Sequence, residues 1–131
     1  MKRILPASVF LLALATAASA TAGLGCSATD KNVAALAFEG LTPRDATHFV
    51  NFDATLEVVA GEKIEFSREH VKTFNWGKNI AVHFARQTPR GLADIRIYAK
   101  PVGDDDIDFE GSYVVRLGKL TKRGKIKCSG G

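Results

Sequence analysis

Hydrophobic and polar residues alternate along most of this chain. The clearest alternation covers residues 50–58, where the apolar positions are Val50, Phe52, Ala54, Leu56 and Val58. A two-residue period places one face of an extended strand in a core and the other face in solvent. The pattern therefore predicts a half-buried β-strand in this segment.

Similar short alternating segments follow, at 64–66, 80–84, 95–99, 113–117 and 126–128. Turn-forming sequences rich in Gly, Pro, Asn and Lys separate them, at 60–63, 75–79, 87–91 and 122–125. Connections this short join antiparallel neighbours, because parallel strands need long crossovers. About seven short strands without a long helix predict an all-β fold, either an antiparallel β-sandwich or a small barrel.

Three segments of the first half follow less clear patterns. Residues 30–40 include an alanine-rich stretch that suits a helix, yet the same stretch suits a short buried strand, which the strands after it favour. Thr42, Pro43 and Asp45 have the order of an N-cap, a first helical residue and an acidic first turn, which predicts a short helical turn. Residues 21–31 are small and polar, which predicts a loose lead-in.

The first twenty residues have a different pattern. A basic start precedes a mostly apolar stretch over 4–15, and Ala18-Ser19-Ala20 supplies small residues at its end. This order is that of a secretory signal peptide, and the apolar stretch is too short to span a bilayer. No later segment has the length of a membrane helix. We therefore expect a cleaved signal peptide over 1–20 and a single β-rich domain over 21–131, exported to a periplasm or secreted.

Cleavage would change the charge balance. Two of the 18 basic residues and none of the 14 acidic residues lie in 1–20, which leaves 16 against 14 and a net charge of +2. This charge is too small to steer the domain to nucleic acid or to an anionic membrane. Aromatic residues do not interleave with the basic ones, which further argues against nucleic acid as a partner.

The chain has two cysteines, Cys26 and Cys128. In an oxidising compartment, the simplest interpretation is one disulfide that joins the first segment to the last strand. The alternative is a lipoprotein anchored at Cys26. The lipidation motif needs a leucine three residues before the cysteine, where this chain has Gly23, and Ala18-Ser19-Ala20 is the better cleavage site. The sequence therefore favours the disulfide.

An acidic segment precedes the last two predicted strands. In extended backbone its alternate residues Asp104, Asp106, Asp108 and Glu110 share one side, and Ca²⁺ prefers several hard oxygens together. The glycine and the final bidentate glutamate of a helix–loop–helix calcium loop are missing. The sequence thus favours a solvated acidic loop, with these four residues as a weak calcium candidate and no cofactor expected.

Four other residues are candidates for binding. Trp76 lies in a turn, where it is either packed on the core beside Phe74 or exposed as an anchor for carbohydrate or protein. Arg90 lies in a short Thr-Pro-Arg-Gly turn of the kind that a protein inhibitor presents to an enzyme. Lys125 and Lys127 point outward from the last strand and suit an acidic glycan, lipid phosphates or an acidic protein. The alternative for the two lysines is a charged edge strand that resists aggregation.

No catalytic motif is visible in the chain. His48, His70 and His83 have no metal-ligand spacing to one another or to Cys, Asp or Glu, and no nucleophile motif or phosphate loop occurs. The sequence favours an exported, non-catalytic binding or accessory domain, with a protein, glycan or lipid of the cell envelope as its partner. A small inhibitor of an extracytoplasmic hydrolase is the second hypothesis. A small hydrolase with scattered catalytic residues is the third.

Overall fold

The computed structural model describes residues 21–104 and 107–131, so the predicted signal peptide lies outside the described part. The described chain is all-β with one short 3₁₀ helix, η2 (Arg68–His70). Its nine strands are β1 (Thr21–Ala28), β2 (Ala35–Pro43), β3 (Asn51–Glu57), β4 (Lys63–Ser67), β5 (Val71–Trp76), β6 (Ile80–Thr88), β7 (Gly91–Pro101), β8 (Asp108–Leu117) and β9 (Leu120–Gly130).

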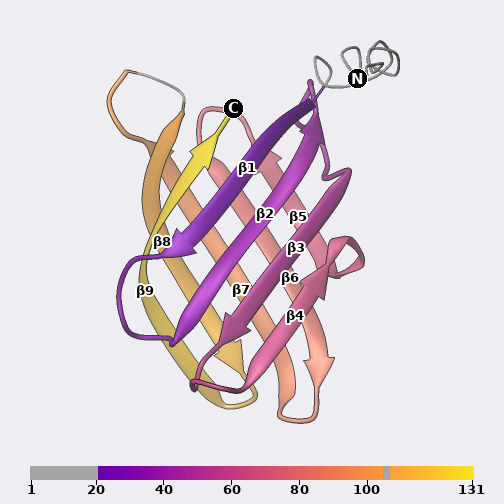
Figure 1. Ribbon diagram of the computed structural model, residues 1–131, viewed down its shortest axis with the longest axis vertical. Coiled ribbons are helices and arrows are strands. Elements are labelled where there is room, and N and C mark those ends of the chain that lie inside the picture. The colour runs from indigo at the N-terminus through magenta and orange to yellow at the C-terminus, as the bar shows by residue number, and fades with distance from the viewer. Residues whose placement is uncertain (1–20, 105–106) are drawn as a thin grey trace, which may run out of the picture.

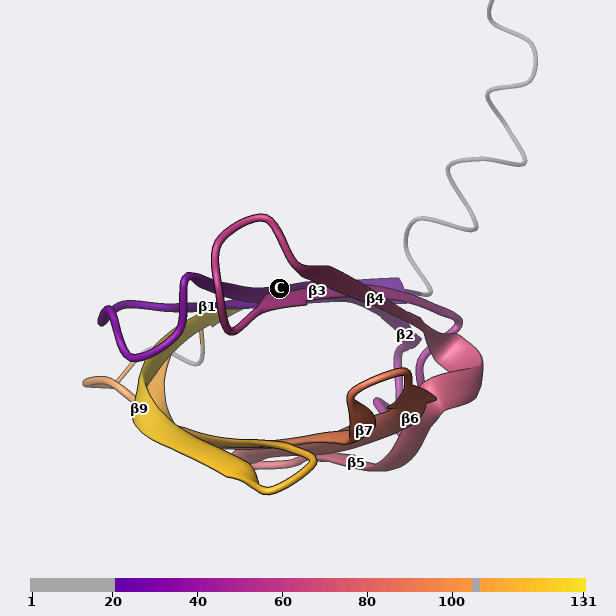
Figure 2. The same ribbon diagram turned by 90° about the horizontal axis from the view of Figure 1, so that it is seen from below.

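All nine strands form one antiparallel sheet in the order β4-β3-β2-β1-β9-β8-β7-β6-β5. Each strand pairs with the next one along the chain except β4 with β5, and β1 also pairs with β9, which joins the two ends of the chain. The sheet curls into a flattened, nearly closed ring (Figures 1 and 2). The all-β prediction is confirmed, and of its two alternatives the barrel is the one that forms. No helix in the described ranges is long and apolar enough to cross a membrane.

The structure shows what the ambiguous segments between residues 21 and 50 form. The segment at 30–40 contributes to a strand, β2, and the expected loose lead-in is β1. The predicted helical turn at Thr42 and Pro43 is wrong, because both residues belong to β2 and pair with β1 to its end. Val50 was expected inside but is 45% exposed, since the neighbouring Phe49 occupies the interior instead.

Several aromatic rings pack together in the barrel interior. The Phe84 ring lies 4.9–6.2 Å, centroid to centroid, from the rings of Phe66, Phe52 and Phe38, and Phe49 stacks on Phe74 at 4.0 Å. Such edge and offset contacts add to the burial free energy of each ring. The aromatic rings pack with the buried aliphatic residues into a single core cluster.

The barrel closes between β4 and β5 through side chains, because these two strands do not pair. The 3₁₀ helix η2 spans this gap (Figure 2). Arg86, from β6, donates a hydrogen bond to the Glu65 carbonyl on the free edge of β4. Phe66 and Phe84 pack together across the same gap. We call this region the seam.

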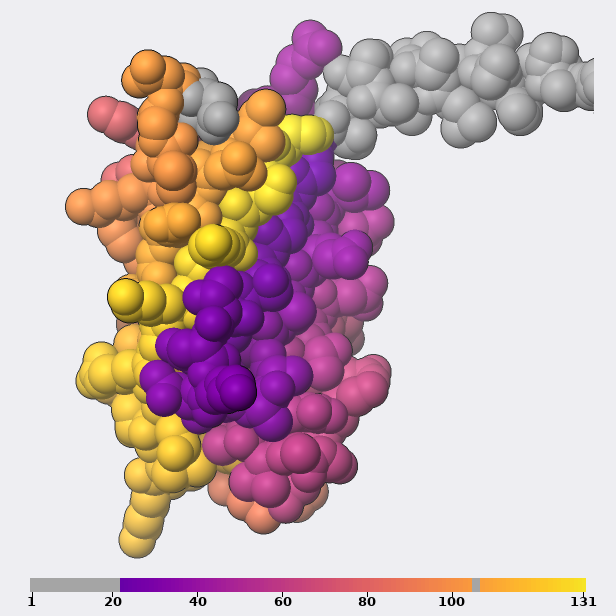
Figure 3. Space-filling model, turned by 60° about the vertical axis from the view of Figure 1, so that its left-hand side comes forward, coloured from indigo at the N-terminus to yellow at the C-terminus, as the bar shows by residue number. Residues whose placement is uncertain are grey.

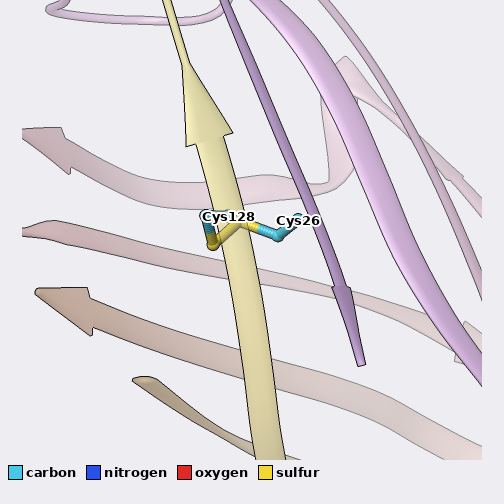
Figure 4. The surroundings of a disulfide bond; sticks show 2 residues. All are labelled: Cys26 and Cys128. Carbon is cyan, nitrogen blue, oxygen red and sulfur yellow. A yellow bond between two sulfur atoms is a disulfide. The ribbon is translucent and has the colours of Figure 1, made fainter. Parts of the chain in front are cut away.

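The predicted disulfide between Cys26 and Cys128 is confirmed. The two residues are direct register partners on β1 and β9, and their side chains point into the barrel (Figure 4). The bond thus fastens the first strand to the last. The interpretation of the last strand as a charged edge is wrong, because β9 lies between β1 and β8 and its backbone is paired on both sides.

Candidate binding groove

The outward face of β1 has almost no side chains. Leu24 and Cys26 point into the core, so the alternate residues Gly23, Gly25 and Ser27 face outward. The register places Glu39 and Leu41 of β2 beside Gly25 and Gly23, and Lys127 of β9 beside Ser27. A strand of very small residues between strands with larger ones leaves a furrow on the outside of the sheet.

This furrow is an open hollow of about 1090 Å³ that follows β1, and we call it the β1 groove. Its floor includes the three outward residues of β1 and Ala37 and Ser129 of the adjoining strands. One wall carries Glu39, Leu41, Asn51 and Asp53, and the other carries Val102, Asp108, Glu110 and Lys127. Figure 3 shows the face on which β1 (indigo) and β9 (yellow) run side by side.

The two glycines of the floor are not required by the backbone. Neither has a positive φ. A Cβ added at Gly25 would come no closer than 3.5 Å to the Phe38 carbonyl oxygen, and one at Gly23 no closer than 3.8 Å to Leu41, so both sites have room for a side chain. Gly within a strand costs roughly 0.5–1 kcal/mol relative to Ala. The open floor is therefore not a by-product of close packing at these positions.

Two glycines on the strands that flank β1, Gly40 on β2 and Gly130 on β9, are required by packing. A Cβ at Gly40 would lie 2.6 Å from the Phe49 ring, and one at Gly130 would lie 2.5 Å from the indole of Trp76. These inward glycines make room for aromatic rings inside the barrel. Gly40 and Gly130 are thus needed for core packing, whereas no packing contact explains Gly23 and Gly25 in the floor of the groove.

The wall formed by β2 and β3 carries two adjacent acidic side chains. Glu39 and Asp53 are direct cross-strand partners, and both are exposed. Within the described ranges neither carboxylate has a hydrogen bond or an ion pair. Like charges directly opposite each other destabilise a sheet. The pair therefore gives this wall a local negative charge that the protein does not neutralise nearby.

The opposite wall is more balanced. Glu110 lies 3.9 Å from the ammonium of Lys127, measured from Oε2 to Nζ. Leu41 on one wall and Val102 on the other are each 41% exposed, and the strands β1, β9 and β8 lie between them. The groove thus combines a floor of small residues, an unbalanced acidic pair and an exposed apolar side chain on each wall.

Of the four binding candidates, Lys127 alone lines the groove. Lys125 is exposed on the same strand, and its backbone N–H donates to Asp30. Trp76 is half-buried and packs on the core against Gly130, in keeping with the packed alternative for this residue. The structure therefore does not bring the four together.

Arg90 belongs to a tight turn between β6 and β7. The Thr88 hydroxyl donates to the Gly91 carbonyl at 2.7 Å and accepts from the Arg90 N–H at 3.1 Å, which makes the turn rigid. The Arg90 guanidinium lies 2.8 Å from Glu62 and lines a separate hollow of about 160 Å³. An inhibitory role for Arg90 would have to break that ion pair.

The acidic segment is only partly described. Asp106 lies outside the described residues, Asp104 is exposed in the turn after β7, and Asp108 and Glu110 lie outward on β8. Among the residues that the structure describes, no group of three or more His, Cys, Asp or Glu is arranged to hold a metal ion. The calcium candidate stays a prediction.

One histidine pairs with a carboxylate, on the outer wall of β6 and β7. His83 Nε2 lies 2.9 Å from Asp94 Oδ2, and Arg96 Nε lies 3.3 Å from Asp94 Oδ1. Partial burial raises the pKa of Asp94, but the His83 hydrogen bond and charge, with those of Arg96, outweigh it and lower the pKa below its usual range. His48 lines a shallow hollow of about 370 Å³ and bonds Thr47. Neither histidine faces the β1 groove.

Sequence reasoning missed the floor of the groove. Residues 23–27 alternate Gly, Leu, Gly, Cys and Ser, which is a two-residue period with small residues on the outward side. The composition resembles a loop, and the period shows only once Leu24 and Cys26 are taken as inward residues. No known protein family, curated protein or solved structure matches this chain.

Proposed function

We propose that the chain is an exported, non-catalytic binding domain, and that the β1 groove holds an extended segment of a partner protein. The observation that carries the proposal is the outer face of β1, where Gly23, Gly25 and Ser27 leave a strip with almost no side chains between two walls. The glycines of that face have room for side chains and no conformational need to lack them. A bare strip of this kind is what close approach of another backbone requires.

The occupant would lie across the face of the sheet and not add a strand to it. Both backbone edges of β1 are already hydrogen-bonded, to β2 and to β9. Contacts must therefore come from the floor and the wall side chains. A strand of eight residues rises roughly 25 Å, which is the length of groove that an extended segment would follow.

Export is the second part of the proposal. The signal-like first twenty residues support it, and so does the disulfide, because such bonds persist in oxidising compartments. Export and groove binding together describe an accessory or binding protein of the cell envelope.

Filling the groove tests its role. In the Gly25→Leu variant the new side chain would occupy the floor, and the space at Cβ lets the barrel fold. The variant Ser112→Leu is the matched control, since Ser112 is exposed on the outer face of β8 and does not line the groove. Each domain would be immobilised and exposed to an envelope extract of the natural host.

We expect the unmodified domain and Ser112→Leu to retain the same proteins, and Gly25→Leu to lose them while its urea midpoint stays within the range of the control. Retention of every captured protein by folded Gly25→Leu would overturn the groove as the binding face.

A further inference from the structure

We propose that the β1 groove selects a basic polypeptide segment, with a Lys or Arg side chain at Glu39 and Asp53 and an apolar side chain against Leu41. This inference rests on the proposed function and assigns the chemistry of the occupant.

The charge of the groove differs from that of the domain. The wall residues include four carboxylates, on Glu39, Asp53, Asp108 and Glu110, and one ammonium, on Lys127. That ammonium is paired with Glu110 on its own wall. The part of the chain after the predicted signal has a net charge of +2. A groove of opposite sign on a slightly basic domain attracts cations locally.

The cation position is set by the register. Glu39 pairs with Gly25 on one side and with Asp53 on the other. A chain lying over Gly25 therefore has Glu39 directly beside it and Asp53 one strand further out. Directly opposite residues have Cβ atoms about 5 Å apart, so one guanidinium or ammonium can contact both carboxylates. A bound cation would also relieve the repulsion between them.

The apolar position is set by one exposed side chain. Gly23 pairs with Leu41, two residues along β1 from Gly25. Leu41 is accessible on the wall of the groove, so an apolar side chain of an occupant that lies over Gly23 can pack against it. The basic and apolar contacts then fall two residues apart, which is the spacing of side chains on one face of an extended chain.

Other occupants fit this groove less well. An acidic glycan or a phosphate would meet the carboxylates of both walls. Neutral sugars stack on exposed aromatic rings, whereas the two aromatic residues that line the groove, Phe38 and Phe109, are buried. A small polyamine would pair with the acidic residues and leave the apolar side chain of Leu41 without a contact.

The test is a binding titration with defined probes. A fluorescein-labelled octapeptide of six lysines and two terminal leucines would be titrated with the mature, disulfide-bonded domain, and anisotropy would report binding. A labelled peptide with six glutamates in place of the lysines and unlabelled spermine as competitor complete the probes.

Two double variants separate the charge at the groove from the charge of the whole domain. The first carries Glu39→Gln and Asp53→Asn. The control carries Glu57→Gln and Glu65→Gln, which remove the same charge on β3 and β4 at positions that do not line the groove.

We expect the lysine peptide to bind and the glutamate peptide not to bind. The groove double variant should bind on the order of tenfold more weakly than the control double variant, and added salt should weaken binding of the unmodified domain. Equal weakening by the two double variants would overturn the inference, and so would absence of peptide binding. Spermine that competes as strongly as the peptide would overturn the polypeptide as occupant.

The two proposals can fail separately. If Gly25→Leu abolishes capture of host proteins while the groove double variant retains them all, the groove binds a partner, but not through contacts with the carboxylates of Glu39 and Asp53. If Gly25→Leu retains them, the groove itself is not the binding face.

Discussion

The hydroxyl of Tyr113 on β8 donates a hydrogen bond of 2.7 Å to Oδ1 of Asp30, in the connection between β1 and β2. Asp30 also accepts the backbone N–H of Lys125 at 2.6 Å, so its carboxylate ties three distant segments together. A Cβ at Gly124 would collide with this pair, which explains the glycine there. The contact fixes the loop at one end of β1 and thereby the floor of the groove.

The Asp30 contact predicts acid sensitivity. The Tyr113 hydrogen bond, with the N–H groups of Lys125 and Asn32, lowers the pKa of Asp30 below its usual 3.8. A carboxyl whose pKa is lower in the folded state stabilises the fold above its unfolded pKa, and this contribution is lost as pH falls through the folded value. Urea midpoints measured from about pH 6 to about pH 2 should show Asp30→Asn destabilised at the upper end and approaching the unmodified protein at the lower end. A constant difference over that range would contradict this.

The Tyr113 hydroxyl is expected to make the folded state less stable at high pH. Burial, together with the hydrogen bond and the charge of Asp30, raises the pKa of Tyr113 above its usual 10.0. Its contribution is complete below that value and is lost as pH rises through the folded pKa. The Tyr113→Phe variant should therefore be less stable than the unmodified protein near neutral pH, and its urea midpoint should fall less steeply as the pH rises above 10.0. Parallel curves would contradict the assignment.

Reduction of the disulfide should destabilise the domain strongly. Cys26 and Cys128 are separated by 102 residues, and a loop-closure model for a loop of this length gives about 4–5 kcal/mol. Urea unfolding with and without reductant measures the change. The double variant Cys26→Ala, Cys128→Ala is the control and should not respond to reductant. A loss below about 1 kcal/mol would show that strand pairing alone holds β1 to β9.

The ring of Trp76 against Gly130 gives a fluorescence test of the interior. In the Gly130→Ala variant the added methyl would overlap the indole and displace it. The tryptophan emission should therefore shift to longer wavelength, and the domain should be destabilised by about 1–3 kcal/mol. The Gly25→Ala variant is the matched control on β1 and should leave the emission unchanged. An unchanged spectrum in Gly130→Ala would contradict the packing of this ring.

Phe84 should be the costliest side chain to truncate at the seam. It is completely buried on β6, and its ring contacts that of Phe66 on β4 across the gap between β4 and β5. Phe84→Ala should lower the free energy of unfolding by about 3–5 kcal/mol in urea titrations. Leu92→Ala, at a side chain that is 45% exposed, should change it by about 0.5 kcal/mol or less. Similar losses in both variants would contradict a seam held by aromatic packing.

The sequence predicts the fold class because alternation is a local signal. Phe52, Leu56, Ile95 and Tyr113 are inward residues of strands that the two-residue period locates directly. Thr42 is different: its helix-start motif is outweighed by the ladder between β1 and β2, which is a long-range interaction. The cysteine pair was predictable because the chain has two cysteines and the signal-like first twenty residues predict an oxidising compartment, which leaves one simple pairing.

The groove was not predictable, because it depends on register. Glu39, Asp53 and Gly25 are distant in sequence and become neighbours only through the pairing of three strands. A glycine that faces solvent and a glycine that faces a ring, such as Gly25 and Gly130, are indistinguishable in the sequence. Their roles separate once the space around each Cβ is known.

Site-specific crosslinking in the natural host tests whether the β1 groove is the face that contacts a partner. A photo-crosslinking amino acid in place of Ser27 would report contacts at the floor of the groove, and the same residue in place of Ser112 would report contacts on the outer face of β8. We expect an adduct with a cell-envelope protein from position 27, none from position 112, and loss of that adduct when Gly25→Leu is added. Equal adducts from both positions, an adduct that survives Gly25→Leu, or no adduct from either position would contradict it.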